Sequence, residues 1–381
     1  MENMNIICDR SELIDAIKRV SRVIPAKHTF HLLEGVLLSV ENKVLKVSRY
    51  DLEVAITVHI NCENFNDNEF SVIANPRLLT NILKNLSKGR VNISVDDNLN
   101  MSVIRHGRRY TLPCMSAEGY PELPVVQAHR MTVYRIAEGV LRDLLDKTLY
   151  ALSTNDAKPI MTGALFDIDK EGLHVVALDG FRLAVATGEI SHDDEGQFIV
   201  PGKMLREVLN NLDGLDHLYE WSIVVDDKRV LFSSGDCMII SRLLEGEFHR
   251  WRATIPPDFV THIKIDKKDM LETVKAAKLL LNERNKCPLK LDINKDTLSM
   301  SVSTGIGSFS DVLSINNIWN NGRLRIGMNP RYFEDAIKHI KSDTIYMKFN
   351  GCNKAILIED EGENAIHIVM PLKLKENENG K

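Results

Sequence analysis

One phrase near the middle of the chain recurs in altered form on either side, about a third of the chain length away. Residues Phe166–Leu173 align with Leu38–Leu45 at an offset of 128 positions and with Leu291–Leu298 at an offset of 125. The chain has 381 residues, so a repeat of this length is a whole domain rather than one turn of a solenoid. The sequence therefore predicts three domains and a short polar tail, at residues 1–127, 128–256, 257–374 and 375–381.

Each third has the same order of elements, with two helices interspersed among strands. The first helix of each third is expected at residues 11–24, 138–152 and 267–281, where apolar residues recur at helical spacing. Ser11 is the expected N-cap of the first of these. The second helix is expected to begin at Pro76, Pro201 and Pro330, because proline suits the first helical turn. The other segments alternate apolar and polar residues, which predicts an α+β fold with two helices packed on antiparallel sheets in each domain.

The composition is that of an ordinary globular protein, with 44% hydrophobic and 27% charged residues. No run of eighteen apolar residues occurs, and Met1–Arg10 lacks the pattern of a secretory signal. We therefore expect a cytoplasmic protein. The six cysteines have neither paired nor metal-ligand spacing, so we expect buried reduced thiols and neither a metal nor a cofactor.

The charge is unevenly distributed along the chain. The formal net charge is −5, which by itself argues against a nucleic-acid partner. The six expected helical segments, however, carry 17 Lys and Arg against 11 Asp and Glu. From charge alone, these helices either form a basic surface or simply carry solvated lysines.

Several motifs in a fixed order point to one family. They are Val20–Pro25 with Asp51-Leu52-Glu53, Tyr120–Pro124, Asp179–Ala184 and Val369–Leu374. Over essentially its whole length the chain resembles the bacterial DNA polymerase III beta sliding clamps. The resemblance implies a head-to-tail homodimer, a six-domain ring that encircles duplex DNA without sequence specificity and has no catalytic activity. Its implied partners are the polymerase III alpha subunit, the clamp loader delta subunit and other clamp-motif proteins.

The resemblance also implies a basic lining of the ring, which attracts phosphates without reading bases. Pro159 and Ile160 stand where the family has aromatic DNA-contacting residues. The implied DNA-binding residues are Arg22, Lys27, Lys84, Lys88, Asn155, Lys158, Lys203, Arg206, Lys275, Lys278, Lys338 and Lys341, and Arg19 and Lys147 are further candidates for the lining.

A second implied surface is an apolar cleft between the second and third domains that binds peptides of the type Gln-Leu-x-Leu-Phe. We expect apolar walls with Arg182 as a polar rim. Leu178, Phe181, His249 and Ala253 depart from the usual family residues, which predicts an altered motif preference, and the tail could partly cover the cleft. The implied cleft residues are Met161, Leu178, Gly180, Phe181, Arg182, Leu183, His249, Thr254, Val369, Met370, Pro371, Leu372, Lys373 and Leu374. The alternative is that they belong to the core.

The ring would close where Tyr110 and Leu112 meet Leu279 and Leu280 of the second subunit. The run of leucines from Leu279 to Leu281 is unusual for an exposed helix end, although these leucines could instead belong to the core.

Two other classes of protein are considered. An enzyme could use Asp51 and Asp179 to hold a metal, but the repeat assigns them to different domains, and we interpret both as loop-capping residues. Gly305-Ile306-Gly307 lacks the strand-loop-helix context of a phosphate-binding loop. A scaffold built from clamp-like domains would keep the repeat but lose the basic helices or the cleft.

Overall fold

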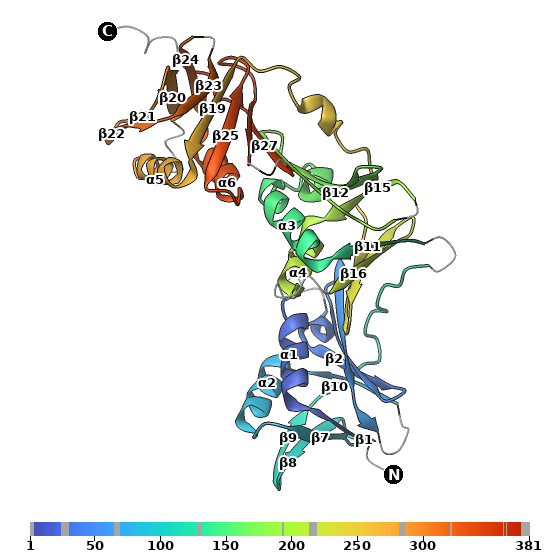
Figure 1. Ribbon diagram of the computed structural model, residues 1–381. Coiled ribbons are helices and arrows are strands. Elements are labelled where there is room, and N and C mark those ends of the chain that lie inside the picture. Colours follow the sequence, from blue (N-terminus) through green and yellow to red (C-terminus); the bar gives the residue numbers. More distant parts are fainter. Residues whose placement is uncertain are drawn as a thin grey trace. The chain divides into compact units, whose positions relative to one another are not determined.

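A computed structural model of the protein is shown in Figure 1. It describes residues 4–23, 30–64, 69–127, 131–192, 194–212, 219–281, 287–320, 322–360, 362 and 364–374. The predicted DNA-binding residue Lys27 and the tail at 375–381 lie outside the described residues. The chain divides into two compact units, residues 1–139, 191–194 and 203–243, and residues 140–190, 195–202 and 244–381. Because both units share the middle third of the chain, the predicted boundaries of three domains remain a prediction.

The first unit contains two antiparallel sheets. A five-stranded sheet has the order β5 (Glu63–Asn64), β1 (Met4–Asp9), β7 (Arg90–Val95), β8 (Asn100–Arg105) and β9 (Arg108–Pro113). A nine-stranded sheet has the order β10 (Met115–Ser116), β6 (Phe70–Ala74), β2 (Val36–Glu41), β3 (Val44–Tyr50), β4 (Val54–Asn61), β18 (Cys237–Arg242), β17 (Arg229–Ser234), β16 (Glu220–Val225) and β11 (Thr132–Ala137). The pairing of β4 with β18 joins strands of the first and middle thirds of the chain.

The helices of this unit begin close to their predicted positions. In α1 (Arg10–Val20) the N-cap is Asp9 rather than Ser11, because the Asp9 carboxylate accepts the N–H groups of Ser11 and Glu12. In α2 (Pro76–Asn85) the Asn75 side chain caps the helix and Pro76 lies in its first turn, as predicted. The helix α4 begins at Gly202 (Gly202–Asn211), because Pro201 is still the last residue of a strand.

The second unit also contains two antiparallel sheets. One has the order β15 (Gly196–Pro201), β12 (Gly163–Asp169), β13 (Gly172–Leu178), β14 (Arg182–Gly188), β27 (Ala365–Val369), β26 (Ile356–Glu359), β25 (Thr344–Phe349), β19 (Thr261–Asp266) and β23 (Asn316–Asn320). The other has the order β22 (Gly307–Ser314), β21 (Thr297–Thr304), β20 (Leu289–Asn294) and β24 (Leu324–Met328). The strand β14 pairs with β27, so the middle and last thirds of the chain form one continuous sheet.

The helices of the second unit are α3 (Glu138–Thr148, continued by η3, Leu149–Ala151), η4 (Pro159–Thr162), η5 (Trp251–Thr254), α5 (Lys267–Lys278) and α6 (Pro330–Lys338). The helices α5 and α6 of the second unit each bury one apolar face. The helices α5 and α6 lie side by side (Figure 1), and Met270, Val274 and Phe333 join the strands in one core. Burying such side chains stabilises a fold by about 1.5–3 kcal/mol each.

The described residues form six α-helices on antiparallel sheets, which confirms the predicted α+β class. No helix in the described part of the chain is long and apolar enough to cross a membrane. All six cysteines are free thiols: Cys8, Cys62 and Cys237 are buried as expected, whereas Cys352 is exposed.

Candidate functional site

The turn between β13 and β14 is built on Asp179. Its Oδ1 accepts the N–H groups of Phe181 at 2.8 Å and Arg182 at 3.0 Å, and Gly180 takes a φ of +92° that L side chains rarely adopt. Asp51 caps its own turn in the same way, by accepting the N–H groups of Glu53 and Val54. Both repeated aspartates are therefore turn caps, as the sequence predicts.

A cavity of about 190 Å³ opens beside this turn. It is lined by Met161, Leu178, Gly180, Phe181, Arg182, Leu183, His249, Thr254, Ile368 and Met370. Nine of these ten residues are among the fourteen predicted for the cleft. The structure therefore brings together side chains from four separate stretches of the chain.

Each wall of this cavity is held by a specific contact. Leu178 and Leu183 are paired in the β13–β14 ladder and belong to a small buried cluster with Trp251. The N–H of Met370 donates to the carbonyl of Phe181 at 2.8 Å, which ties the segment after β27 to the turn. Met370 keeps 40% of its surface exposed, so an apolar side chain from outside can cover it.

The prediction that Val369 lines the cleft is wrong. Its side chain is fully buried in the core, because strand residues alternate between two faces and Ile368 takes the cavity side. Pro371, Leu372, Lys373 and Leu374 do not line the cavity. The N–H of Leu372 instead donates to the carbonyl of Gly327 on β24 at 2.8 Å.

Arg182 lines the cavity, and most of its guanidinium is engaged by other side chains of the unit. Its Nε donates to Asp179 Oδ2 at 3.0 Å and its Nη1 to Asp335 Oδ2 on α6 at 2.5 Å. The guanidinium also lies over the rings of Tyr150 and Tyr332, and only 11% of the side chain is exposed. Arg182 is therefore a positioning residue that joins the β13–β14 turn to η3 and α6.

An aromatic cluster lies against this arginine. The hydroxyl of Tyr150 is 2.9 Å from His367 Nδ1, and the Tyr150 ring stacks on His339 with centroids 4.4 Å apart. Burial, reinforced by His339 and Lys147, lowers the pKa of His367 to about 3, and burial raises the pKa of Tyr150. Both groups stay neutral near pH 7, so Arg182 faces no added positive charge from His367.

Replacing Arg182 with methionine is expected to destabilise the protein by about 2 kcal/mol, below the usual cost of breaking a buried ion pair because Asp335 is partly exposed. The loss arises because Asp179 and Asp335 both lose the guanidinium that pairs with them. A thermal unfolding scan should show a Tm lower by about 4–8 °C. Arg250→Met is the matched control, since Arg250 is exposed and forms no ion pair with any described residue; an equal drop there would contradict the assigned role.

Six of the twelve predicted DNA-binding residues lie on α-helices, and several of the twelve are ion-paired. Lys203 is 2.7 Å from Asp51, Lys338 is 2.6 Å from Glu334, and Lys341 is 2.5 Å from Asp143. Lys278 also pairs with Glu334, and Arg22 donates to the carbonyl of Asn210. Lys84, Lys88, Arg206 and Lys275 are exposed, and the described part of the chain offers them no ion pair.

Two of the further lining candidates are used inside the fold. Lys147 is only 4% exposed and is held by Asp143, Asp360 and Asn364, so it was wrongly predicted to line the ring. Arg19 donates to Asn211 at 3.0 Å and to Asp236 at 3.1 Å. Asn155 and Lys158 are exposed in the loop before η4.

The residues predicted for the subunit interface differ in exposure. Leu279, which follows α5, is 83% exposed, whereas Leu280 is half-buried and packs against the core. Tyr110 is half-buried on β9, the edge strand of its sheet. Leu112 is only 1% exposed, so its prediction was wrong: on β9 it points into the core of its own chain.

One group of side chains has the composition of a metal site. Ligand atoms of Asp169, Glu171 and His174 lie within 4.8 Å of one another. However, Asp169 already accepts hydrogen bonds from His174 at 3.1 Å and from Arg252 at 2.7 Å. A guanidinium bound to this carboxylate competes with a cation, so we assign no metal to this group.

The fold is that of the DNA-clamp proteins, and comparison with known proteins supports this class. Family models for the N-terminal, central and C-terminal domains of the DNA polymerase III beta subunit match residues 4–124, 135–250 and 252–373. The beta sliding clamps of Bacillus subtilis and Halalkalibacterium halodurans are 27% and 26% identical over 384 residues, covering 97% of this chain and all of each relative. A crystal structure of the B. subtilis clamp has a TM-score of 0.88 at 23% identity, with 98% of this chain and 100% of that one covered.

This chain belongs to the family of bacterial DNA polymerase III beta subunits, the beta sliding clamps. It is therefore a DNA sliding clamp, a non-catalytic processivity factor of DNA polymerase III. This excludes the alternative interpretation of the chain as an enzyme.

Proposed function

We propose that two copies of this chain form a closed ring around duplex DNA in the bacterial cytoplasm. Through its cleft the ring would bind short apolar motifs of the polymerase III alpha subunit, the clamp loader delta subunit and other proteins. The observation that carries this proposal is the cavity beside the Asp179 turn, where predicted motif-binding side chains from four separate stretches meet. The direct test is binding of a labelled Gln-Leu-Ser-Leu-Phe peptide, measured by fluorescence polarisation.

Two features support a head-to-tail ring. Strand β9 ends the five-stranded sheet of the first unit, and β22 ends the four-stranded sheet of the second unit. Edge strands offer unpaired backbone groups to another chain. Val312 on β22 and Leu279 at the end of α5, a helix that contacts β22, are exposed apolar residues. Contact with β9 of a second copy would remove them from water. Two such contacts per dimer would close the ring.

The exposed basic residues on the helices support non-specific DNA binding. Lys84 on α2, Arg206 on α4 and Lys275 on α5 have no ion pair within the described residues, so their charges are available to phosphates. Lys203, Lys278, Lys338 and Lys341 would contribute less, because carboxylates already neutralise them. Phosphate contacts of this kind hold a duplex without reading its sequence.

Replacing Lys84 and Lys275 with alanine is expected to weaken binding to a short linear duplex and to lower its salt dependence. Each lost phosphate contact makes the negative slope of the logarithm of the association constant against the logarithm of the salt concentration shallower by about 0.9. The change from two lost contacts per chain should be readily measured by titration at several salt concentrations. Lys170→Ala, in the turn between β12 and β13, is the control and should change neither quantity. A sequence preference, or an unchanged slope in the double variant, would count against this DNA-binding surface.

A further inference from the structure

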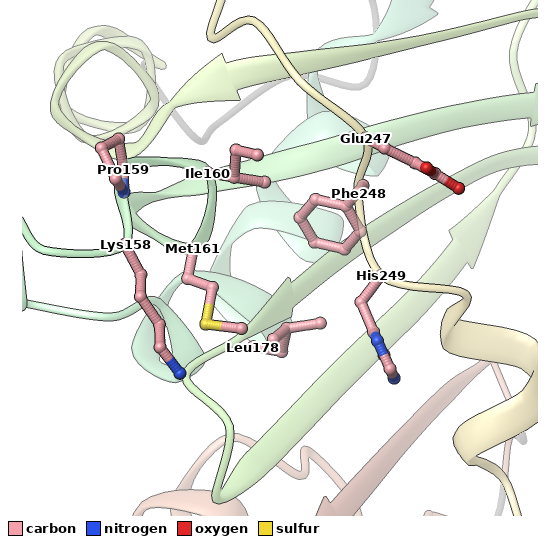
Figure 2. Close-up of a pocket in the computed structure, with 8 residues that line it drawn as sticks. All are labelled: Lys158, Pro159, Ile160, Met161, Leu178, Glu247, Phe248 and His249. Atoms are coloured by element: carbon pink, nitrogen blue, oxygen red, sulfur yellow. The ribbon is translucent and has the colours of Figure 1, made fainter.

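A second cavity of about 360 Å³ adjoins the first one. The two cavities share Met161, Leu178 and His249 as a common wall. The larger cavity is otherwise lined by Lys158, Pro159, Ile160, Glu247 and Phe248 (Figure 2). None of these five residues was predicted to belong to the cleft. The volume of this second cavity lies at the lower end of the range typical of ligand-binding pockets.

The walls of the second cavity are fixed by the local backbone. Pro159 begins the short helix η4, which the Thr162 hydroxyl stabilises by donating to the carbonyl of Pro159 at 2.7 Å. Opposite, Gly246 takes a φ of +133°, and a Cβ there would lie 2.5 Å from Ile160 Cδ1. Only glycine lets the 245–249 segment pass so closely over Ile160. Ile160, Met161 and Phe248 all pack on the same buried cluster, so the cavity is part of a packed structure.

The polar groups at the second cavity are unevenly placed. Figure 2 shows the Lys158 side chain extending along the Met161 side of the cavity, whereas the carboxylate of Glu247 points away from it. Lys158 is exposed and has no ion pair within the described residues. The mouth is therefore apolar with one available positive charge, which favours an apolar side chain next to a carboxylate.

We infer that the second cavity is a further lobe of the partner cleft, which takes an additional apolar side chain of the same peptide. An aspartate or glutamate beside that side chain meets Lys158. This inference rests on the proposed peptide-binding function and specifies its partners: they carry an acidic and apolar extension outside the five-residue motif. Pro159 and Ile160 then serve the cleft, at positions where the family has aromatic DNA contacts.

The test compares a short peptide with extended ones. Gln-Leu-Ser-Leu-Phe is the short probe, and Leu-Asp is added through one glycine at either end, to give Asp-Leu-Gly-Gln-Leu-Ser-Leu-Phe and Gln-Leu-Ser-Leu-Phe-Gly-Leu-Asp. Matched peptides carry serine in place of the added leucine. Burial of one more leucine should tighten binding of one extended peptide about tenfold relative to the short probe, in fluorescence polarisation. The serine versions should lose most of this gain.

Two variants assign the gain to the second cavity. Ile160→Ser and Lys158→Glu should each reduce the tenfold gain to about twofold or less while leaving the affinity for the short probe unchanged. Lys170→Glu, an exposed lysine elsewhere in the same unit, should keep the gain. Equal affinity of short and extended peptides for the wild type, or a gain that persists in Ile160→Ser, overturns the inference alone. Failure of the short probe to bind the wild type overturns the proposed function itself.

Discussion

Replacing Met161 and Met370 together with alanine is expected to weaken binding of Gln-Leu-Ser-Leu-Phe at least 100-fold. Both methionines line the cavity beside the Asp179 turn, from η4 and from the segment after β27. A side chain that fills such a cavity is a typical binding hot spot, and loss of one wall costs roughly 1–2 kcal/mol. Met161 is only partly buried at the edge of the cluster around Trp251, and Met370 is 40% exposed, so subunit association should be retained and the loss of thermal stability should be small.

Leu372→Ala is the matched control for this experiment. Leu372 is 36% exposed and was predicted from the sequence to line the cleft, but it pairs with Gly327 away from the cavity. Its removal should change peptide affinity less than twofold. Unchanged binding in the Met161/Met370 double variant would locate the partner site elsewhere, and a large loss in Leu372→Ala would favour the sequence-based outline of the cleft.

Replacing Leu279 with aspartate is expected to convert the dimer into monomers at micromolar concentration. The side chain is 83% exposed in a single chain, and a carboxylate enclosed at a subunit contact without a partner costs several kcal/mol. The dimer dissociation constant should rise by at least 100-fold, measured by sedimentation velocity over a dilution series. Leu280 is left unchanged, because it is half-buried against the core and its replacement would mix folding with association.

The control for this second experiment is Ile318→Asp. Ile318 lies on β23 in the other sheet of the same unit and is 55% exposed. Its replacement should leave the dimer intact. A dimer that persists in Leu279→Asp, or dissociation in both variants, would contradict the assigned interface.

Periodic patterns made much of the fold predictable from the sequence. The proline-initiated helix α2, its counterpart α6 and the turn-capping aspartates follow from local chemistry that acts within a few residues. The first N-cap was misplaced by two residues, because Asp9 and Ser11 are both good caps and only the geometry of β1 selects Asp9. Sequence also could not show that the middle third of the chain would be shared by two compact units.

The sequence predicted which stretches of the chain form the candidate cleft. It predicted less well which side chains of those stretches point into the cavity. The family resemblance implies the contiguous stretch from Val369 to Leu374, whereas the alternation of side chains along β27 puts Ile368 and Met370 on the cavity side and Val369 on the other. The sequence could have revealed this alternation. Burial of Lys147, by contrast, depends on Asp360 and Asn364 more than two hundred positions away, and no local pattern reports such a partner. The ion pair of Arg182 with Asp335 likewise joins residues far apart in the sequence, so no local pattern predicts it.

Small-angle X-ray scattering with an in-line mass determination tests the central claim most directly. A ring-forming clamp predicts a mass near twice 43.1 kDa and a distance distribution with the profile of a hollow ring. The Leu279→Asp variant should give half that mass and no central hole. A wild-type monomer, or a dimer with a solid compact profile, would contradict the ring and would favour a scaffold built from clamp domains.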